Sequence, residues 1–352
     1  MKILFVACKN DYGKPELGLS FEYYNIYEPM VHMNSSAHNV IYFPFDEIAL
    51  KYGKEEMNKK LLETVKVQKP DLCFFFLFGN EIEKDTIKKI TDFSTITFNW
   101  FADDKWRFEN FSKLWAPAFS WVSTDQPERL KDYYKIGYKN VIVGGWACNH
   151  NLYKPLDVPK KYDVTFIGQP HGDRKKIVNA IKKAGINIEC FGRGWPNGKV
   201  SQEEMIKIFN QSKINLNFSK CSGSFGLKYL ARIFVDVQNG KIVLKNPATW
   251  WGNLKSLIAR SQNEIKGRNF EIPGCNAFLI SGYAKGLENF YELEKEVVCF
   301  QNTKDLIKKI KYYLEHEDER EAIAKAAYER TLKDHTYEKR LNDIFAKIFT
   351  NK

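Results

Sequence analysis

Residues 263–275, NEIKGRNFEIPGC, gather side chains that could bind a phosphorylated ligand. Lys266 and Arg268 place two cations two residues apart, and Gly267 between them allows close backbone approach. A diphosphate needs such cations, whereas Glu271 could accept hydrogen bonds from two hydroxyls of a sugar. The string is too polar for a core helix. Its alternative interpretation is an Arg–Glu surface pair at helical spacing.

Two earlier turns could add to such an anion site. In DVTFIGQPHGDRKKI a strand ends at Gly168 and Arg174 opens a helix, whose first N–H groups favour an anion. In CFGRGWPNGKV, Gly192 and Arg193 would let backbone approach a flat ligand that Val200 could cover. Ordinary tight turns explain both stretches equally well. Neither has the spacing of a dinucleotide-binding fingerprint or a P-loop.

The elements that must position these residues form two alternating series. Short apolar strands separated by charged helical stretches predict parallel sheets covered on both faces. Strands are expected at 2–7, 39–45, 71–78, 94–101, 119–124 and 140–145, and then at 163–168, 187–192, 213–219, 276–281 and 296–300. Ser201 followed by Glu204 predicts a capping box at a helix start.

The two series predict an α/β protein of two doubly wound, Rossmann-like domains. These are residues 1–150 and 151–335, joined by a polar linker at 149–162, with a C-terminal helix at 336–352 packing back on the first domain. Such sheets bind ligands beyond the carboxyl ends of their strands. Two domains facing a cleft would therefore suit a reaction between two substrates, one held by each domain.

Composition excludes several other classes of protein. The 352 residues are too many for one core of usual size. Seven scattered cysteines without a CxxC pair argue against a zinc site or a disulfide frame. The chain has no apolar run near the roughly 20 residues that span a bilayer. Its start is typical of a first strand rather than a signal peptide, which predicts a cytoplasmic protein.

Much of the net charge of +11 lies in one window. Residues 220–268 hold nine Lys or Arg against two acidic residues, a net +7, which favours an acidic partner over a merely solvated surface. Residues 225–237 predict an amphipathic helix, and Trp250 and Trp251 follow. This basic stretch, 225–260, suits an anionic membrane surface, although a helix packed on its own domain is the alternative. Nucleic acid ranks third because no reader motif is present.

Three motifs of the second half carry a family resemblance. FGRGWPNGKVSQEEMIKIFNQSKINLNFS, EIKGRNFEIPGC and EREAIAKAAYERTLKDHTYEKR together resemble the CgeB-like, spore-maturation-type glycosyltransferases of GT-B fold. GLSFEYYN and NWFADDKWRF of the first half resemble the same proteins less diagnostically. The resemblance implies a nucleotide-sugar donor in the C-terminal domain and an acceptor facing the N-terminal one. Asn263 stands where relatives often carry a second Glu, with Glu264 one step off.

The resemblance also implies roles for individual residues. Glu271 would bind ribose or donor-sugar hydroxyls, while Lys266, Arg268 and Arg174 would hold the diphosphate. The full set of expected donor-binding residues is Gly168, Arg174, Gly192, Arg193, Val200, Asn217, Ser219, Lys266, Arg268, Glu271, Cys275 and Asn276.

Four residues of the first half are candidates for the catalytic base. Asp103 and Asp104 follow the fourth expected strand, at the end that would face the cleft. A carboxylate there could take the proton of an acceptor hydroxyl if the reaction inverts. Glu22 and His32, after the first strand, are rivals, and ordering of a loop or helix end is the alternative for each. No DxD motif occurs in the sequence, which argues against an obligatory metal or other cofactor.

The sequence therefore predicts transfer of a sugar from a nucleotide diphosphate to a hydroxyl of a glycan, lipid-linked or protein acceptor, as in polysaccharide biosynthesis. Cations and helix N-termini would stabilise the departing diphosphate. The alternatives are an epimerase or phosphorylase of the same fold and a noncatalytic protein that binds sugars or polyanions. The basic stretch further predicts that the cytoplasmic protein associates peripherally with the inner face of the membrane. The sugar, the base and the stereochemistry stay open.

Overall fold

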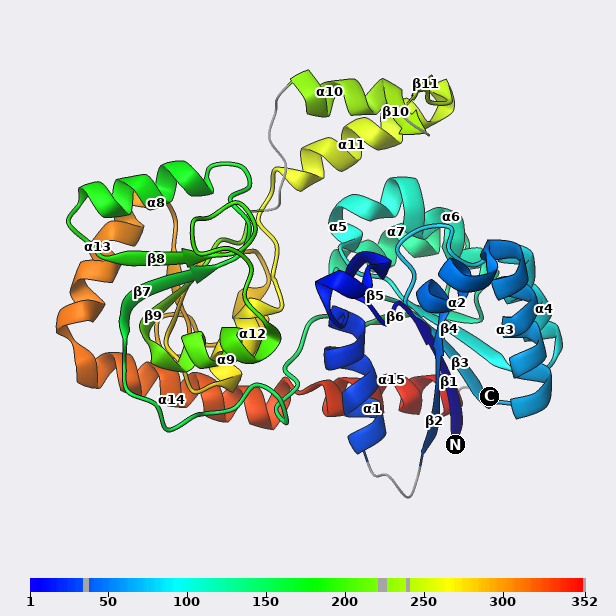
Figure 1. The fold of residues 1–352 in the computed structure, drawn as a ribbon, viewed down its shortest axis with the longest axis horizontal. Coiled ribbons are helices and arrows are strands. Elements are labelled where there is room, and N and C mark those ends of the chain that lie inside the picture. The colour runs from blue at the N-terminus through cyan, green and yellow to red at the C-terminus, as the bar shows by residue number, and fades with distance from the viewer. Residues whose placement is uncertain (34–37, 221–226, 239–240, 351–352) are drawn as a thin grey trace. The chain divides into compact units, whose positions relative to one another are not determined.

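The computed structural model describes residues 1–33, 38–220, 227–238 and 241–350, and the chain divides into two units (Figure 1). Unit 1 contains Met1–Gly145, Pro247–Ser256 and Tyr337–Lys352, and unit 2 contains Trp146–Asn246 and Leu257–Thr336. The linker expected at 149–162 packs within unit 2. Asn149 is buried there, and the N–H of Leu156 donates to Oδ1 of Asn210 at 2.8 Å.

Unit 1 is built on a parallel sheet of strand order β2-β1-β3-β4-β5-β6. Its strands are β1 (Lys2–Ala7), β2 (Asn39–Pro44), β3 (Leu72–Phe75), β4 (Ile96–Trp100), β5 (Trp121–Thr124) and β6 (Val141–Val143). Because β1 pairs with both β2 and β3, the strand order reverses beside β1. The crevice at such a reversal is where open α/β sheets bind ligands.

Helices cover both faces of this sheet. They are α1 (Glu28–His32), α2 (Phe45–Tyr52), α3 (Lys54–Gln68), α4 (Lys84–Asp92), α5 (Asp104–Arg107), α6 (Lys113–Trp115), α7 (Leu130–Lys135) and α15 (Tyr337–Thr350), with π-helical turns η3 (Tyr23–Tyr27) and η4 (Phe108–Ser112). The 3₁₀ turns are η1 (Asp11–Gly13), η2 (Pro15–Leu17), η5 (Ala116–Ala118), η6 (Pro127–Arg129) and η7 (Pro247–Thr249).

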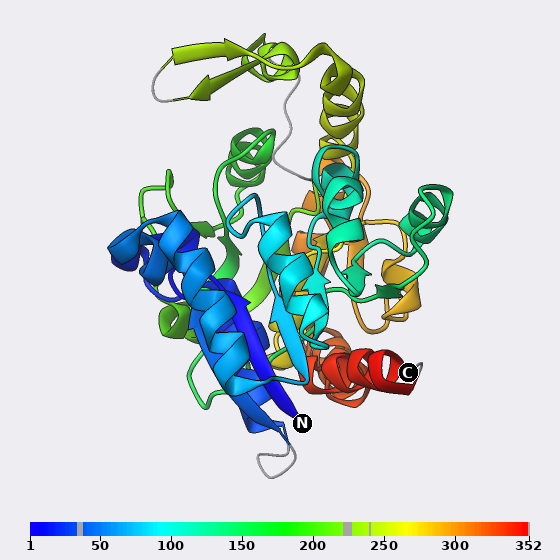
Figure 2. The same ribbon diagram turned by 90° about the vertical axis from the view of Figure 1, so that its right-hand side faces the viewer.

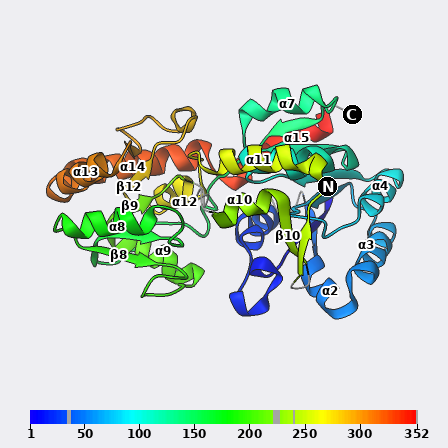
Figure 3. The ribbon, with the colours of Figure 1, turned by 90° about the horizontal axis from the view of Figure 1, so that it is seen from above.

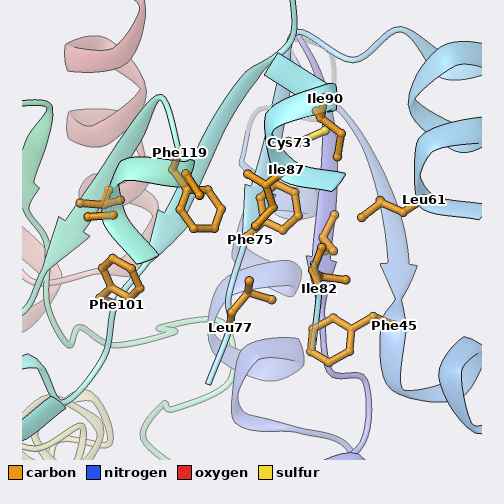
Figure 4. Close-up of a cluster of buried hydrophobic side chains, with 14 of the residues drawn as sticks. Phe45, Leu61, Cys73, Phe75, Leu77, Ile82, Ile87, Ile90, Phe101 and Phe119 are labelled. Atoms are coloured by element: carbon orange, nitrogen blue, oxygen red, sulfur yellow. The ribbon is translucent and has the colours of Figure 1, made fainter. Parts of the chain in front are cut away.

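Alternate strand residues of unit 1 fill two apolar layers, as strand geometry requires. On one face Phe75 packs among side chains of α3 and α4, which lie beside each other (Figures 3 and 4). On the other face Phe74 meets Phe345 at 6.5 Å, and Trp100 meets Tyr337 at 6.3 Å, between ring centroids. The last helix, α15, is therefore part of the core of unit 1.

Unit 2 is a second parallel sheet, of strand order β13-β12-β9-β7-β8. Its elements are β7 (Tyr162–Ile167), α8 (Arg174–Lys183), β8 (Ile188–Phe191), α9 (Gln202–Gln211), β9 (Ser212–Asn217), α12 (Arg268–Gly274), β12 (Leu279–Gly282), η8 (Leu287–Asn289), β13 (Val298–Phe300), α13 (Thr303–Glu315) and α14 (Glu317–Asp334). Helices α8 and α13 share one apolar layer with the sheet, and α9 and α12 share the other (Figures 1 and 3).

The predicted fold class is confirmed, because each expected strand has its counterpart in one of the two parallel sheets. The helix start expected at Ser201 is confirmed, since the N–H of Glu204 donates to Oγ of Ser201 at 3.1 Å, which is one of the two bonds of the expected capping box. The expectation that residues 263–275 are too polar for a core helix is wrong. Residues 269–274 of α12 are all buried.

The basic stretch folds into an arm, defined here as residues 227–260 without 239 and 240. It comprises α10 (Leu227–Phe234), β10 (Val235–Gln238), β11 (Lys241–Leu244) and α11 (Trp250–Arg260). Figure 2 shows β10 and β11 as an antiparallel pair of yellow-green arrows. The helix expected over 225–237 is therefore wrong beyond Phe234, because Val235 pairs with Leu244 across the hairpin. Cys221, Phe225 and Gly226 lie outside the described residues.

Candidate functional site

A buried polar network joins the ends of β9 and β12 to the start of α12. Nδ2 of Asn217 donates to Oδ1 of Asn269 at 3.1 Å and to Oγ of Ser281 at 3.0 Å. Nδ2 of Asn269 donates to the same Ser281 oxygen at 2.9 Å. The N–H of Lys266 donates to Oδ1 of Asn269 at 2.9 Å. Buried amides held this way rigidify the backbone that carries them, so residues 264–271 have a fixed position at the strand ends.

Ser219 fixes the same segment from its other side. Its carbonyl accepts from the N–H of Glu264 at 2.9 Å, and its hydroxyl donates to the carbonyl of Gly282. Asn217 and Ser219 thus lie where the sequence predicted, at the exit of β9. Asn269 and Ser281 were missed, because spacing along the chain gives no signal that they meet.

Both cations of this segment are ion-paired to buried carboxylates. Nζ of Lys266 lies 2.5 Å from a carboxylate oxygen of Glu264, and Arg268 pairs with Glu271. The carboxylate side chains are 1% and 2% exposed, whereas the lysine and arginine side chains are 25% and 29% exposed. The cations therefore face outward and the carboxylates lie beneath them. Glu264, which follows the position where relatives often carry a second Glu, is one of these two buried carboxylates.

Arg268 is held by more than its carboxylate. Its guanidinium lies over the ring of Phe209, 5.5 Å from the centroid. Burial favours the neutral form, but the Glu271 carboxylate and the Tyr153 hydroxyl outweigh it and raise the pKa of Arg268. Arg268 stays charged in a fixed orientation, and Glu271 supports it from below. The alternative of an exposed surface pair does not hold, because Glu271 is buried.

The predicted glycines bring backbones together at the exits of β7 and β8. A Cβ added at Gly192 would lie 2.6 Å from the carbonyl oxygen of Gly168, so these strand ends touch only because side chains are absent. Nε1 of Trp195 donates to the same carbonyl at 2.7 Å. Val200 is half-buried and packs on the apolar layer of α9 and α12. The close approach that Gly192 allows is therefore between two backbone segments of unit 2, the exits of β7 and β8.

Arg174 and Arg193, the two other arginines expected to bind the donor, have different surroundings. Arg174 donates to the carbonyls of Gln169 at 2.9 Å and of Phe218 and Lys220 at 3.3 Å each. It therefore ties the exit of β7 to the exit of β9. Arg193 is exposed on the turn after β8.

Cys275 and Asn276 follow the last residue of α12. This helix returns from the carboxyl ends of the strands to the start of β12 at Leu279. Cys275 is buried, which raises the pKa of its thiol. Asn276 has a φ of +51° and ends the helix, a conformation that asparagine tolerates. The Cys275 thiol lies within electrostatic range of Glu271 and Arg268.

In unit 1, Glu22 lies in the segment between β1 and β2, the strands beside which the sheet order reverses. Ser20 precedes it, donates its hydroxyl to the carbonyl of Cys8 at 2.6 Å and accepts from the N–H of Tyr23 at 3.1 Å. This fixes the start of the helical segment that carries Glu22. The carboxyl is 4% exposed, and burial raises its pKa from an ordinary 4.5 to about 7.

The two aspartates after β4 have different surroundings. Asp104 is fully buried, its carboxylate accepts from the hydroxyl of Tyr133 at 2.7 Å, and burial raises its pKa. Asp104 therefore acts as a structural carboxyl that fixes the buried Tyr133 in the core of unit 1. Asp103 is half-buried with a φ of +57°, and its N–H donates to a carboxylate oxygen of Asp125 at 3.1 Å.

His32 is separated from the other three candidates. It is the exposed last residue of α1, which runs back toward the start of β2 (Figure 1). In a parallel crossover that end of the helix lies at the opposite edge of the sheet from the strand exits. The π-helical turns η3 and η4 each follow a candidate acid, and such turns are frequent at functional sites.

Metal ligands and membrane spans were searched over the same described residues. No group of three or more His, Cys, Asp or Glu side chains there is arranged to hold a metal ion. Among the described helices, none combines the length and apolarity that crossing a bilayer requires. Metal independence stays a prediction.

Two parallel-sheet α/β units with polar sites at their strand ends define the GT-B fold, and comparisons with solved structures agree. A glycosyltransferase from Rickettsia africae aligns over 100% of this chain and 99% of its own, with a TM-score of 0.61 and 14% identity. HepE from Anabaena, in complex with UDP-glucose, aligns over 99% of this chain and 100% of its own, with a TM-score of 0.59 and 12% identity.

Sequence comparison gives the class of protein. Residues 174–346 match the model of the family described as glycosyl transferase-like. Spore protein CgeB of Bacillus subtilis is 19% identical over 282 residues, which are 79% of this chain and 82% of CgeB. These matches confirm the predicted resemblance, and the chain is a glycosyltransferase of GT-B fold.

Proposed function

We propose that the chain transfers a sugar from a nucleotide diphosphate donor to an acceptor hydroxyl, with the donor held at the strand ends of unit 2. The observation that carries this proposal is the double ion pair of residues 264–271, anchored on the buried network of Asn217, Asn269 and Ser281. HepE, which aligns over nearly the whole chain, is in complex with UDP-glucose, and this supports UDP as the nucleotide.

The ion pairs fit the chemistry of a departing diphosphate. Lys266 and Arg268 are oriented before the donor arrives, so little reorganisation is needed when negative charge grows on the leaving group. The Glu271 carboxylate helps to keep Arg268 charged. Because these cations can compensate the leaving charge, we propose that no metal is required.

On the acceptor side we propose Glu22 as the general base. Its pKa of about 7 lets it accept a proton near neutral pH, which is the condition for efficient proton transfer. The acceptor oxygen forms a bond to the anomeric carbon of the donor sugar as Glu22 takes the hydroxyl proton. The bond from that carbon to the diphosphate oxygen breaks, and the diphosphate leaves with the bonding electrons.

Donor binding tests the first proposal directly. UDP-glucose and UDP-N-acetylglucosamine are titrated into the full chain by calorimetry, with and without EDTA. We expect binding that EDTA leaves unchanged and that Lys266→Ala weakens by about tenfold, as loss of one charge-assisted contact predicts. The matched control is Lys213→Ala, because Lys213 is ion-paired to Asp163 away from the strand exits.

Two outcomes contradict this proposal. If no sugar nucleotide binds, or if both lysine variants bind alike, the donor site lies elsewhere. Conversion of the donor in the absence of acceptor, into an epimer or a sugar phosphate, would instead identify the epimerase or phosphorylase of the same fold.

We also propose that the arm brings the enzyme to an anionic membrane surface. Ile242 and Leu244, on one face of β11, are 76% and 65% exposed, and Trp251 of α11 is 67% exposed. The arm carries six Lys or Arg against Asp236 alone. Exposed apolar side chains in a stretch rich in cations suit the boundary between acyl chains and anionic headgroups.

Co-sedimentation with vesicles tests the arm. We expect the chain to pellet with phosphatidylglycerol vesicles and not with phosphatidylcholine vesicles, and Ile242→Asp with Leu244→Asp to reduce pelleting at least fivefold. Leu50→Asp in α2 is the control, because Leu50 is 74% exposed in unit 1. Equal pelleting of the arm variant and the wild type would show that the arm does not bind lipid.

A further inference from the structure

Tyr12 is the most exposed large apolar side chain of the described residues, at 81%. It lies in η1, the turn after β1, with φ +54° and ψ +26°. A bulky residue rarely adopts this left-handed conformation, which costs about 1–3 kcal/mol. An aromatic ring held in water on a strained backbone adds nothing to packing, so its presence needs another explanation.

The turn that presents Tyr12 is fixed by hydrogen bonds. The N–H of Asp11 donates to the carbonyl of Gly18 at 2.9 Å, which closes the loop of residues 11–18. The carboxylate of Asp46 accepts from the N–H of Lys9 at 2.8 Å and from that of Asn10 at 3.0 Å. The ring of Tyr12 is therefore carried by a tied scaffold, and less freedom is lost when a ligand stacks on it.

This turn borders the proposed base. The N–H of Ser20 donates to the carbonyl of Lys9 at 2.8 Å, which joins the start of the loop to the helical segment of Glu22. Asp11, the neighbour of Tyr12, lies within electrostatic range of the Glu22 carboxyl. The turn that carries Tyr12 thus adjoins the segment in which the acceptor hydroxyl would be activated.

The charge around this turn selects among acceptors. Burial, and then the carboxyls of Asp46, Glu22, Glu81 and Asp11, raise the pKa of the Cys8 thiol, which places four acidic groups around one point. A phosphate or carboxylate on the acceptor would be repelled there. An uncharged sugar would not be repelled, and its hydroxyls could donate to these carboxylates.

We propose that Tyr12 forms an acceptor subsite that stacks an uncharged sugar ring against its face, beside Glu22. This inference rests on the proposed function and names the acceptor class: a neutral saccharide. The apolar C–H face of a pyranose packs on an aromatic ring, while the hydroxyls at its edge remain available for hydrogen bonds. A tyrosine offers this contact at a low cost in side-chain entropy.

Acceptor kinetics test the subsite. With UDP-glucose as donor and neutral oligosaccharides as acceptors, we expect Tyr12→Ala to raise the acceptor KM at least tenfold and to leave the donor KM unchanged. Tyr12→Phe keeps the stacking ring and should stay within twofold of wild type. Tyr134→Ala is the control, because Tyr134 is a half-exposed tyrosine of α7. An unchanged KM in Tyr12→Ala would overturn the inference.

Binding without turnover separates this inference from the proposed function. The full chain is applied to an array of neutral, sialylated and phosphorylated oligosaccharides. Binding to neutral glycans that Tyr12→Ala abolishes supports the subsite even if no sugar nucleotide binds, an outcome that would refute the proposed function alone. A preference for acidic glycans, or equal binding by the variant, would overturn the subsite.

Stability supplies a second check. Tyr12→Gly should keep or raise Tm, because glycine adopts a positive φ without strain. A Tm lowered by several degrees would show that the ring packs, which contradicts the inference.

Discussion

The strand exits of the two units use the same acidic residue type in opposite ways. In unit 2, Glu264 and Glu271 are buried, and each lies against a cation, Lys266 or Arg268. In unit 1, Glu22 is equally buried, but its neighbours include Asp11 and Asp46, and burial raises its pKa to about 7. The first pair of carboxylates supports positive charge, and the other carboxyl is prepared to exchange a proton.

The difference teaches that burial alone does not set the role of a carboxyl. In unit 2 each buried carboxylate lies against a cation and supports it in a fixed position. In unit 1 burial, and to a smaller extent the acidic neighbours, raise the pKa of Glu22 to about 7, which suits a general base. The two units thus divide the proposed reaction into leaving-group stabilisation and proton removal.

The largest expected effect is on turnover. Glu22→Gln removes the proton acceptor and should lower kcat about 10³-fold, within the range for loss of a general base. The wild-type kcat should rise with pH to a plateau above about pH 7, because the base acts only when deprotonated. Steady-state kinetics from pH 5 to 9 measure both. The substitution Glu28→Gln, in α1 of the same helical segment, should stay within twofold of wild type.

A different result would move the base elsewhere. If Glu22→Gln retains its kcat while Asp103→Asn loses it, the half-buried aspartate after β4 is the proton acceptor. If neither variant loses activity, neither Glu22 nor Asp103 is the base, and the contrast drawn between the two units does not concern proton transfer.

The next effect is on stability. Glu271→Gln leaves Arg268, whose side chain is 29% exposed, without its carboxylate, which should lower the free energy of unfolding by about 4 kcal/mol. Urea denaturation measures it. The control is Glu55→Gln, because the ion pair of Glu55 with Lys59 is exposed and should contribute less than about 1 kcal/mol. Equal losses in the two variants would mean that the buried pair has no special role.

Much of the fold could be predicted from the local pattern of apolar and polar residues, and the exceptions show which features that pattern does not encode. Strands such as β3 are buried on both faces and therefore read as continuous apolar runs. The hairpin of β10 and β11 was missed because LKYLARIF continues into VDV with helical periodicity, and pairing with 241–244 overrides it. Pairing partners across a turn leave no mark on the periodicity of one strand.

The site was less predictable for the same reason. Lys266, Arg268 and Glu271 could be named from their types and spacing, but α12 was expected to be too polar for burial. Helix α12 can be buried because Asn269 accepts a hydrogen bond from Asn217 and Glu271 forms an ion pair with Arg268. The first of these pairings joins residues 52 positions apart. Likewise nothing in the sequence separates Glu22 from Asp104, since only the folded chain shows that the carboxylate of Asp104 accepts a hydrogen bond from Tyr133.

The smallest expected effect is a pH dependence of stability that isolates Glu22. Its pKa in the folded chain, about 7, exceeds the ordinary value of 4.5, so the folded state binds more protons than the unfolded state between these values. The stability it contributes is present below about pH 4.5 and is lost as pH rises through about 7, a change of about 3 kcal/mol. Glu22→Gln, which does not titrate, should remove this fall.

The measurement is the free energy of unfolding of wild type and Glu22→Gln from pH 4.5 to 8.5. Other groups titrate alike in both proteins, so the difference between the two curves reports Glu22 alone. Glu56→Gln, at an exposed position of α3, should follow the wild-type curve. A constant difference across the range would show that Glu22 titrates normally in the folded chain. Glu22 would then lose its claim to be the base.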